Sequence, residues 1–146
     1  MIPLKLWEHQ NAIKTLYSKC VEKVCLTHQI TRMELDILLF LANNPCFDTA
    51  TDIVEIRYLS KSQVSASIKL LEEKGCLRRE YFEGNRKTAH LKICDGALSI
   101  VEDGKAAQET FASIMLQGIE PEAIENIKGY FDHILRNIND YLKEDE

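Results

Sequence analysis

The sequence predicts a mainly α-helical protein with one small β-hairpin near its middle. Three features support this prediction. Amphipathic stretches, with apolar residues every three or four positions, occupy both ends of the chain. Short helices with their own start signals lie between these stretches. Two segments that alternate apolar and polar residues then follow, joined by a polar turn. The length of 146 residues fits a single domain.

The first two helices have clear boundaries. The first is predicted from Leu6 to about Thr27, with Lys and Glu between its apolar positions. Thr31 begins the second with a capping box, since its hydroxyl can accept a backbone N–H while Glu34 reaches back. Asn43-Asn44-Pro45 ends this helix because proline does not continue one.

Two further helices follow closely. The third is predicted from near Thr49 to Arg57-Tyr58. Ser60 is expected to cap the fourth, with Gln63 completing a second capping box. Lys74-Gly75 ends the fourth helix, with glycine at the left-handed cap position. The apolar stripe of this helix repeats at i, i+4 and i+7, as Val64, Ile68 and Leu71.

The hairpin is predicted directly after these helices. Its strands are Cys76–Phe82 and Thr88–Cys94, and the polar, basic loop Glu83–Lys87 joins them. A lone hairpin is marginally stable in water, so it must pack on the helices. Two short helices followed by a basic-tipped hairpin predict a winged helix-turn-helix, with the hairpin as the wing.

Two longer helices end the chain. One runs from Asp95 to Gly118, and the other begins at Pro121, a residue favoured in the first helical turn. The last helix carries apolar residues at alternating steps of three and four: Ile124, Ile127, Phe131, Ile134, Ile138 and Tyr141. This heptad-like face needs a partner, and a second copy of the chain is the simplest one.

Charge is unevenly distributed along the chain. The net charge is −5, yet the span Ala50–Asp95 holds nine Lys/Arg against seven Asp/Glu, a net +2. The middle of the chain is therefore basic relative to both ends. This distribution indicates a docking surface for a polyanion such as DNA.

Several classes of protein are disfavoured. The longest uncharged apolar stretch, Ile37–Ala42, is much shorter than the ~18 residues that span a bilayer. The first ten residues do not resemble a signal peptide, so we expect a cytoplasmic protein without a membrane partner. No Gly-rich phosphate loop or Gly-x-Ser-x-Gly elbow is present, which argues against an enzyme. The scattered histidines predict no metal site, and no cofactor is expected.

The five cysteines are not spaced as a disulfide framework or a zinc ribbon. In a reducing cytosol, most of them are expected to be small buried thiols. Cys94 is a candidate redox sensor because Lys92 lies close to it in sequence, and a nearby cation stabilises a thiolate.

The segment Leu59–Arg79 resembles the recognition-helix segment of MarR-family transcription factors. The likeness extends to the wing residues Asn85-Arg86-Lys87 and to Leu91–Cys94, and it is most specific over Leu71–Arg79. The resemblance implies a homodimeric winged helix-turn-helix regulator of the bacterial cytoplasm. In such a regulator residues 31–94 form the DNA-binding lobe, while residues 1–30 and 95–146 form the dimerisation helices.

The chain departs from the family pattern at three places. Asn85 stands where an Asp usually precedes the wing arginine, which weakens the ion pair expected to orient Arg86, although an amide oxygen can still accept its hydrogen bond. Ala66 occupies a position on the recognition helix that is often basic. Cys94 replaces the Thr that usually ends the second wing strand, and the following glycine comes one residue early.

The resemblance, together with helix geometry, indicates which residues face DNA. Residues at the start of the recognition helix are best placed for base edges in the major groove, and its lysines for phosphates. Arg86 at the wing tip is expected in the minor groove, whose narrow A·T-rich stretches attract arginine. The predicted contacts are Ser60, Lys61, Ser62, Gln63, Ser65, Lys69, Arg86 and Lys87.

The expected function is a repressor that binds a pseudo-palindromic operator in double-stranded DNA as a homodimer. The resemblance also implies a small aromatic inducer that releases the DNA, and the sequence leaves release by thiol oxidation, or no inducer at all, as alternatives. Candidate lining residues for such a ligand are Trp7, Tyr17, Phe111 and Met115. The alternative is a winged-helix module for protein–protein contact that does not bind DNA.

Overall fold

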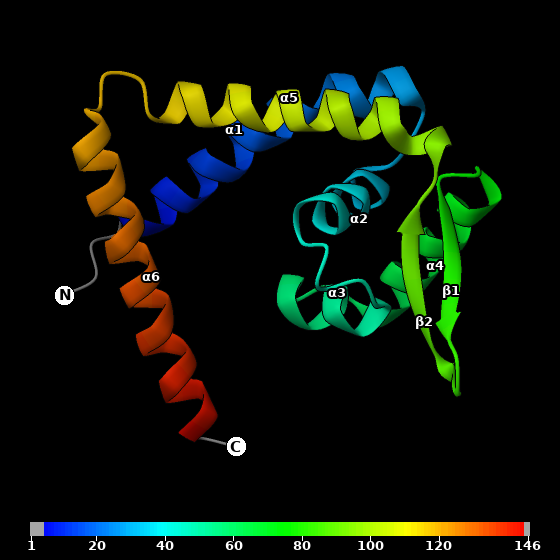
Figure 1. Cartoon of the computed structure of the whole chain (residues 1–146). Helices are drawn as coiled ribbons and strands as arrows, with labels where there is room; N and C mark the ends of the chain where they lie inside the picture. Colours follow the sequence, from blue (N-terminus) through cyan, green and yellow to red (C-terminus); the bar gives the residue numbers. More distant parts are fainter. Residues whose placement is uncertain (1–4, 145–146) are drawn as a thin grey trace. The chain divides into compact units, whose positions relative to one another are not determined.

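A computed structural model describes residues 5–144 and confirms a mainly helical chain with one antiparallel hairpin (Figure 1). The chain divides into two compact units, Met1–Phe111 and Ala112–Glu146. The elements are α1 (Lys5–His28), α2 (Arg32–Asn43), α3 (Ala50–Arg57), α4 (Lys61–Glu73), β1 (Leu77–Phe82), β2 (Asn85–Ile93), the 3-10 turn η1 (Asp95–Ala97), α5 (Leu98–Met115) and α6 (Pro121–Glu144).

Threonine caps set the starts of α2 and α3. Thr31 Oγ1 accepts the backbone N–H of Glu34 at 3.1 Å, and Glu34 Oε1 accepts the Thr31 N–H at 3.2 Å. Thr49 and Asp52 exchange the same two bonds at the start of α3. The capping box predicted at Thr31 is therefore confirmed, and reciprocal bonding at Thr49 fixes a third helix whose own apolar pattern is weak.

The capping box predicted at the start of α4 is only half formed. Ser60 Oγ accepts the Gln63 backbone N–H at 3.5 Å, but the Gln63 side chain makes no return bond within residues 5–144. Ser60 Oγ lies instead 3.0 Å from Ser62 Oγ. The side chain of Gln63 is thus left on the surface, available to another molecule.

The core of the first unit lies between the helices and the root of the hairpin. The predicted apolar stripe of α4 is buried, as are most apolar residues of α2. Leu77 of β1 and Leu91 of β2 are also buried and join the hairpin to this core. Helix α5 approaches α2 closely at Gly104, where an added Cβ would lie 2.8 Å from a Leu39 methyl group. Only glycine fits this contact without displacing the leucine.

The hairpin differs from the prediction in its loop. The predicted loop Glu83–Lys87 shortens to the two residues Glu83-Gly84, and β2 begins at Asn85 rather than Thr88. Strand pairing is regular from Leu77 opposite Ile93 to Glu80 opposite His90. It resumes only at Phe82 opposite Asn85, so Tyr81 alone faces residues 86–89. The extra residues of β2 form a bulge, which period-two alternation cannot reveal.

The second unit contains α6, in which no residue is buried. Its heptad-like positions leave large apolar side chains exposed: Ile127, Phe131, Ile134, Ile138 and Tyr141. Across the described chain, none of the helices combines the length and the apolar character that crossing a bilayer would require.

Candidate nucleic-acid interface

The exposed face of α4 carries the polar side chains predicted to touch DNA. Because Val64, Ile68 and Leu71 are buried against the core, the 100° step of the helix turns most of the residues between them outward, although Ser67 is buried. Every predicted contact on this helix is exposed: Ser60, Lys61, Ser62, Gln63, Ser65 and Lys69. Ala66 lies on the same face, so this face has a gap in its positive charge midway along the helix.

Charge pairing separates the nine basic side chains of Ala50–Asp95 into two groups. Five of them form ion pairs: Arg57 with Asp36, Lys74 with Glu34, Arg78 with Glu80, Arg79 with Glu72 and Lys92 with Asp48. The other four have no acidic partner within residues 5–144: Lys61, Lys69, Arg86 and Lys87. The unpaired charge therefore gathers on the outer face of α4 and at the hairpin tip.

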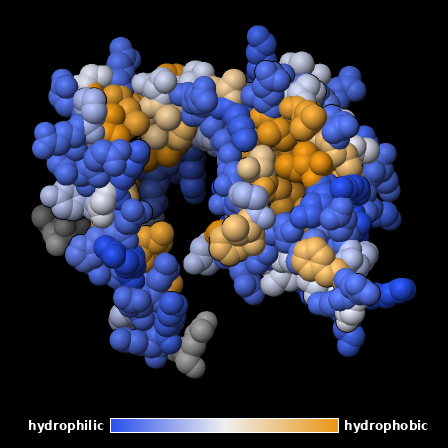
Figure 2. Space-filling view, viewed as in Figure 1, coloured by the Kyte–Doolittle hydropathy of each residue, from blue (hydrophilic) through white to orange (hydrophobic). Residues whose placement is uncertain are grey.

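Asn85 shapes the hairpin tip in a way the sequence did not predict. Its Oδ1 accepts the backbone N–H groups of Lys87 at 3.1 Å and Thr88 at 3.3 Å, and its Nδ2 lies 3.4 Å from Thr88 Oγ1. The expectation that the amide oxygen accepts a hydrogen bond from Arg86 is wrong, because that oxygen is used by the backbone. Asn85 thus fixes the turn that presents Arg86, and the guanidinium is exposed (Figure 2 shows the end of the hairpin as hydrophilic).

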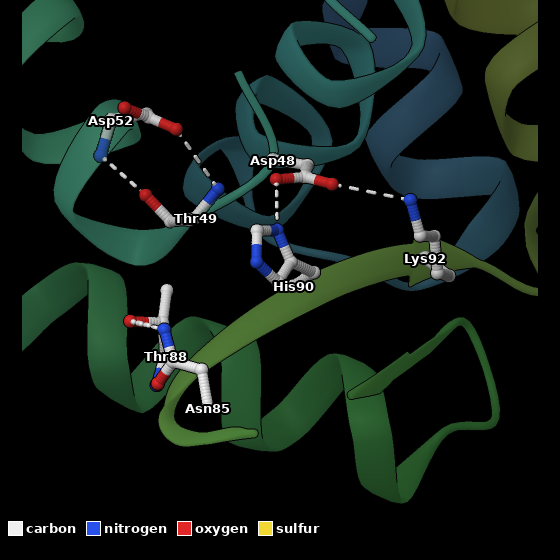
Figure 3. A network of polar contacts seen from close by, with 7 residues as sticks. All are labelled: Asp48, Thr49, Asp52, Asn85, Thr88, His90 and Lys92. Atoms are coloured by element: carbon white, nitrogen blue, oxygen red, sulfur yellow. Dashed lines mark hydrogen bonds and ion pairs between the residues drawn. The ribbon is translucent and has the colours of Figure 1, made fainter. Parts of the chain in front are cut away.

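Asp48 joins the hairpin to the helices. Its Oδ1 lies 2.7 Å from His90 Nδ1, and its Oδ2 accepts a hydrogen bond from Lys92 Nζ at 3.2 Å (Figure 3). Its backbone oxygen also accepts the Leu91 N–H at 2.7 Å. Burial opposes ionisation of Asp48, but the hydrogen bonds from His90 and Lys92 outweigh it and hold the pKa of this carboxyl below its usual range.

Sequence reasoning missed Asp48 because its partners lie more than 40 residues away. The only signal was the period-two alternation of β2, which places His90 and Lys92 together on the face opposite Leu91. That alternation does not indicate which loop covers the face.

A hollow of about 630 Å³ lies in the first unit between α1, α2, α3 and α5. Tyr17 and Phe111 both line it, and their rings meet edge to face with centroids 5.1 Å apart. The guanidinium carbon of Arg32 lies 4.6 Å from the centre of the Tyr17 ring. Of the other two predicted lining residues, Trp7 is exposed on α1 away from this lining, and Met115 lies in the second unit.

Cys94 lies just beyond β2, directly opposite Cys76. The Cys94 N–H donates to the Cys76 carbonyl at 2.9 Å. Burial raises the pKa of the Cys76 thiol. The Lys92 ammonium, expected to stabilise a Cys94 thiolate, is instead bonded to Asp48. Lys92 is therefore paired with Asp48 rather than with the Cys94 thiol.

Residues 28–87 match the MarR family, and they span α2, α3, α4, β1 and the start of β2. The chain is 24% identical over 91 residues to the HTH-type transcriptional regulator PecS of Dickeya dadantii (strain 3937). That alignment covers 61% of this chain and 55% of PecS, so the chain matches little more than half of its relative.

Solved structures extend the likeness along the chain. A MarR-family transcriptional regulator from Listeria monocytogenes in complex with 26mer DNA has a TM-score of 0.80 at 16% identity, covering 96% of this chain and 91% of that one. The S. aureus MepR–DNA complex has a TM-score of 0.73 at 16% identity, covering 90% and 94%. At this identity, the structures establish the fold. Residues 28–87 therefore match the MarR family in sequence, and the chain has the winged helix-turn-helix fold of the solved MarR-family structures that it resembles.

Proposed function

We propose that the protein is a transcriptional regulator that binds specific sites in double-stranded DNA. The observation that carries this proposal is the separation of basic side chains into paired and unpaired groups. Lys61 and Lys69 on α4 and Arg86 and Lys87 on the hairpin have no acidic partner in the described chain, whereas each of the other five cations of Ala50–Asp95 lies in an ion pair. Unpaired cations on one helix and one hairpin tip match the phosphates and grooves of a duplex.

The contacts divide by their chemistry. With α4 in the major groove, the amide of Gln63 can pair with adenine through two hydrogen bonds, and the hydroxyls of Ser62 and Ser65 can reach base edges. Ser60, Lys61 and Lys69 lie where phosphates pass the start and the side of the helix. Arg86 is presented by the hairpin toward the adjacent minor groove. Sequence selection therefore rests on Gln63, the serines and Arg86.

The active form is a homodimer, in which two copies present two recognition helices. The exposed apolar face of α6 supports this proposal, because five large side chains in water favour association with a second apolar surface. Two-fold symmetry then requires a pseudo-palindromic operator with half-sites about one helical turn apart. When the operator overlaps a promoter, the bound dimer excludes RNA polymerase and represses transcription.

The salt dependence of duplex binding tests the proposal. Genomic fragments retained by the pure protein are sequenced, and the shared site is titrated by fluorescence anisotropy between about 50 and 200 mM salt. Counterion release predicts a linear fall of log K with log salt, and a mutated site binds more weakly at every salt concentration. A protein-interaction module would show no duplex affinity even at low salt, and that outcome would overturn the proposal.

A small aromatic anion is the proposed inducer. Arg32 and Arg57 both border the hollow next to Tyr17 and Phe111, and they share one acid, Asp36. The carboxylate of such a ligand can pair with one guanidinium while the ligand's aromatic ring packs against the Tyr17 and Phe111 side chains. Such a ligand releases DNA if it binds the DNA-incompetent conformation better than the competent one.

The release mechanism is tested with two additions to the same anisotropy assay. Salicylate is expected to lower the operator affinity of the wild type and to have no effect on Arg32→Ala. Hydrogen peroxide, compared between the wild type and Cys94→Ser, tests the alternative release by thiol oxidation. Unchanged operator affinity in both titrations contradicts regulation by these two inducers while leaving DNA binding intact.

A further inference from the structure

We infer that Asp48 is a positioning residue for DNA recognition, which acts by holding the hairpin at a fixed angle to α4. The inference rests on the proposed function, because it concerns how Arg86 and α4 reach one duplex together. Asp48 itself is 17% exposed, lies in the segment between α2 and α3, and carries a negative charge that phosphates repel, so its role is not that of a direct DNA contact.

Asp48 makes three bonds to three consecutive residues of β2. The carboxylate bonds to His90 Nδ1 at 2.7 Å and to Lys92 Nζ at 3.2 Å (Figure 3). The backbone oxygen of Asp48 accepts the Leu91 N–H at 2.7 Å. Within the described part of the chain, this is the one acidic side chain bonded to two residues of the hairpin. Asp48 also directly precedes Thr49, the cap of α3. The three bonds from Asp48 to His90, Leu91 and Lys92, called the clamp below, therefore connect the hairpin to the first helix of the helix-turn-helix.

A continuous set of contacts leads from the clamp to the tip. The Phe82 ring stacks on the His90 imidazole, with centroids 4.0 Å apart and planes 26° apart. Phe82 is paired with Asn85, the residue whose side chain bonds to the backbone N–H groups of Lys87 and Thr88 and so fixes the backbone on both sides of Arg86. The position of Arg86 is therefore tied through Asn85, Phe82 and His90 to the Asp48 carboxylate.

The hairpin needs such a clamp because its apolar anchors lie only near its root. Leu77 and Leu91 are buried, whereas both residues at the tip end of β1, Tyr81 and Phe82, are exposed. From Leu91 to Arg86, the strand spans roughly 17 Å at ~3.3 Å per residue. A rotation of about 10° at the root would move the tip by ~3 Å, which is a whole hydrogen-bond length.

Asp48→Ala, alone and combined with Arg86→Ala, tests this inference by operator titration. If Asp48 acts through the wing, we expect about a tenfold loss of affinity for Asp48→Ala and a salt slope lowered as in Arg86→Ala. The double variant should then bind within about twofold of Arg86→Ala, since the wing contact can be lost only once. If the affinity losses of the two single variants multiply in the double variant, or if Asp48→Ala binds the operator as tightly as the wild type, the inference is overturned.

Asp52→Ala is the matched control. Asp52 is also a hydrogen-bonded carboxylate at the start of α3, but its partner is Thr49 and it makes no bond to the hairpin. We expect any loss of operator affinity in Asp52→Ala to multiply with that of Arg86→Ala. If Asp48→Ala is too unstable to titrate, Asp48→Asn replaces it, because it keeps the shape of the side chain.

Amide hydrogen exchange tests the clamp without DNA. Exchange at residues 85–93 should speed up at least tenfold in Asp48→Ala and stay at the wild-type rate in Asp52→Ala. Equal exchange in the two variants would overturn the clamp whatever the protein binds. Faster exchange in a protein whose wild type ignores every duplex would instead contradict the proposed function while sustaining the clamp.

Discussion

Lys74 Nζ lies 2.8 Å from Glu34 Oε2, in an ion pair whose two side chains differ greatly in solvent exposure. The carboxylate of Glu34 is 1% exposed, whereas the Lys74 side chain is 39% exposed. Glu34 also accepts the Thr31 N–H and so completes the cap of α2. The pair connects the start of α2 to the end of α4. Removing Lys74 and removing Glu34 should therefore lower the unfolding free energy by different amounts.

Lys74→Met is expected to destabilise the fold more than Glu34→Gln. Without Lys74, a buried carboxylate loses its counter-ion, which costs about 3 kcal/mol of unfolding free energy. Without the Glu34 charge, Lys74 can turn to solvent, and the cost is about 1 kcal/mol. Urea denaturation at pH 7 measures both values. Equal losses would show that Glu34 is hydrated despite its burial.

Tyr58→Gly is expected to stabilise the protein. Tyr58 ends α3 with φ of 52°, in the left-handed region that side chains disfavour, and it is 82% exposed. Glycine relieves roughly 1–2 kcal/mol of strain but adds unfolded-chain entropy, leaving a gain of about 0.5–1 kcal/mol. Thermal denaturation checks the shift. Tyr58→Ala is the control, because alanine keeps the strain and should bring no gain.

Arg86→Ala and Lys69→Ala should weaken DNA binding in different ways. Losing Arg86 removes a groove contact and should cost about 1–3 kcal/mol at the operator, with a smaller loss at unrelated sequences. Losing Lys69 removes a phosphate contact, so affinity should fall about equally for all sequences and the salt slope should drop by about one. Titrating both variants against operator and random duplex separates the effects. An unchanged Arg86→Ala affinity would exclude the wing from recognition.

The contribution of Asp48 to stability should disappear at low pH. Its hydrogen bonds hold the folded-state pKa below the ordinary value of 3.8, so its stabilisation is fully present above that value. The contribution is lost as the pH falls through the lower folded-state pKa. Wild type and Asp48→Asn should therefore differ in unfolding free energy at pH 7, and the difference should shrink steadily below about pH 4. Urea denaturation across this range checks it, and a constant difference would contradict the assignment.

Ile134→Glu is expected to shift the protein toward monomers. Ile134 lies within the exposed apolar face of α6, where an added carboxylate would have to be buried in a dimer. Sedimentation velocity measures the change. Arg136→Glu is the control, because residue 136 lies about 200° around the helix from residue 134. A wild type that is monomeric at high concentration would contradict the dimer itself.

Local signals in the sequence were enough to predict the helices and the general form of the hairpin. Thr31 and the stripe of Val64, Ile68 and Leu71 specify their helices through neighbours within a few residues. The interactions that position the wing were not predictable in this way. Asp48 meets His90 across 42 residues, and the bulge opposite Tyr81 depends on how two strands pair rather than on either strand alone. Periodicity identifies faces, but it does not identify the segment that covers them.

The exposure of α6 has a thermodynamic consequence. A helix of 24 residues that buries none of them gains little beyond intrinsic propensity and a few surface pairs such as Lys128 with Glu125. Its order must then come largely from association, and by mass action its melting temperature should climb with protein concentration. Dilution should unwind α6 while the winged lobe stays folded, so that oligomerisation and helix formation become a single equilibrium.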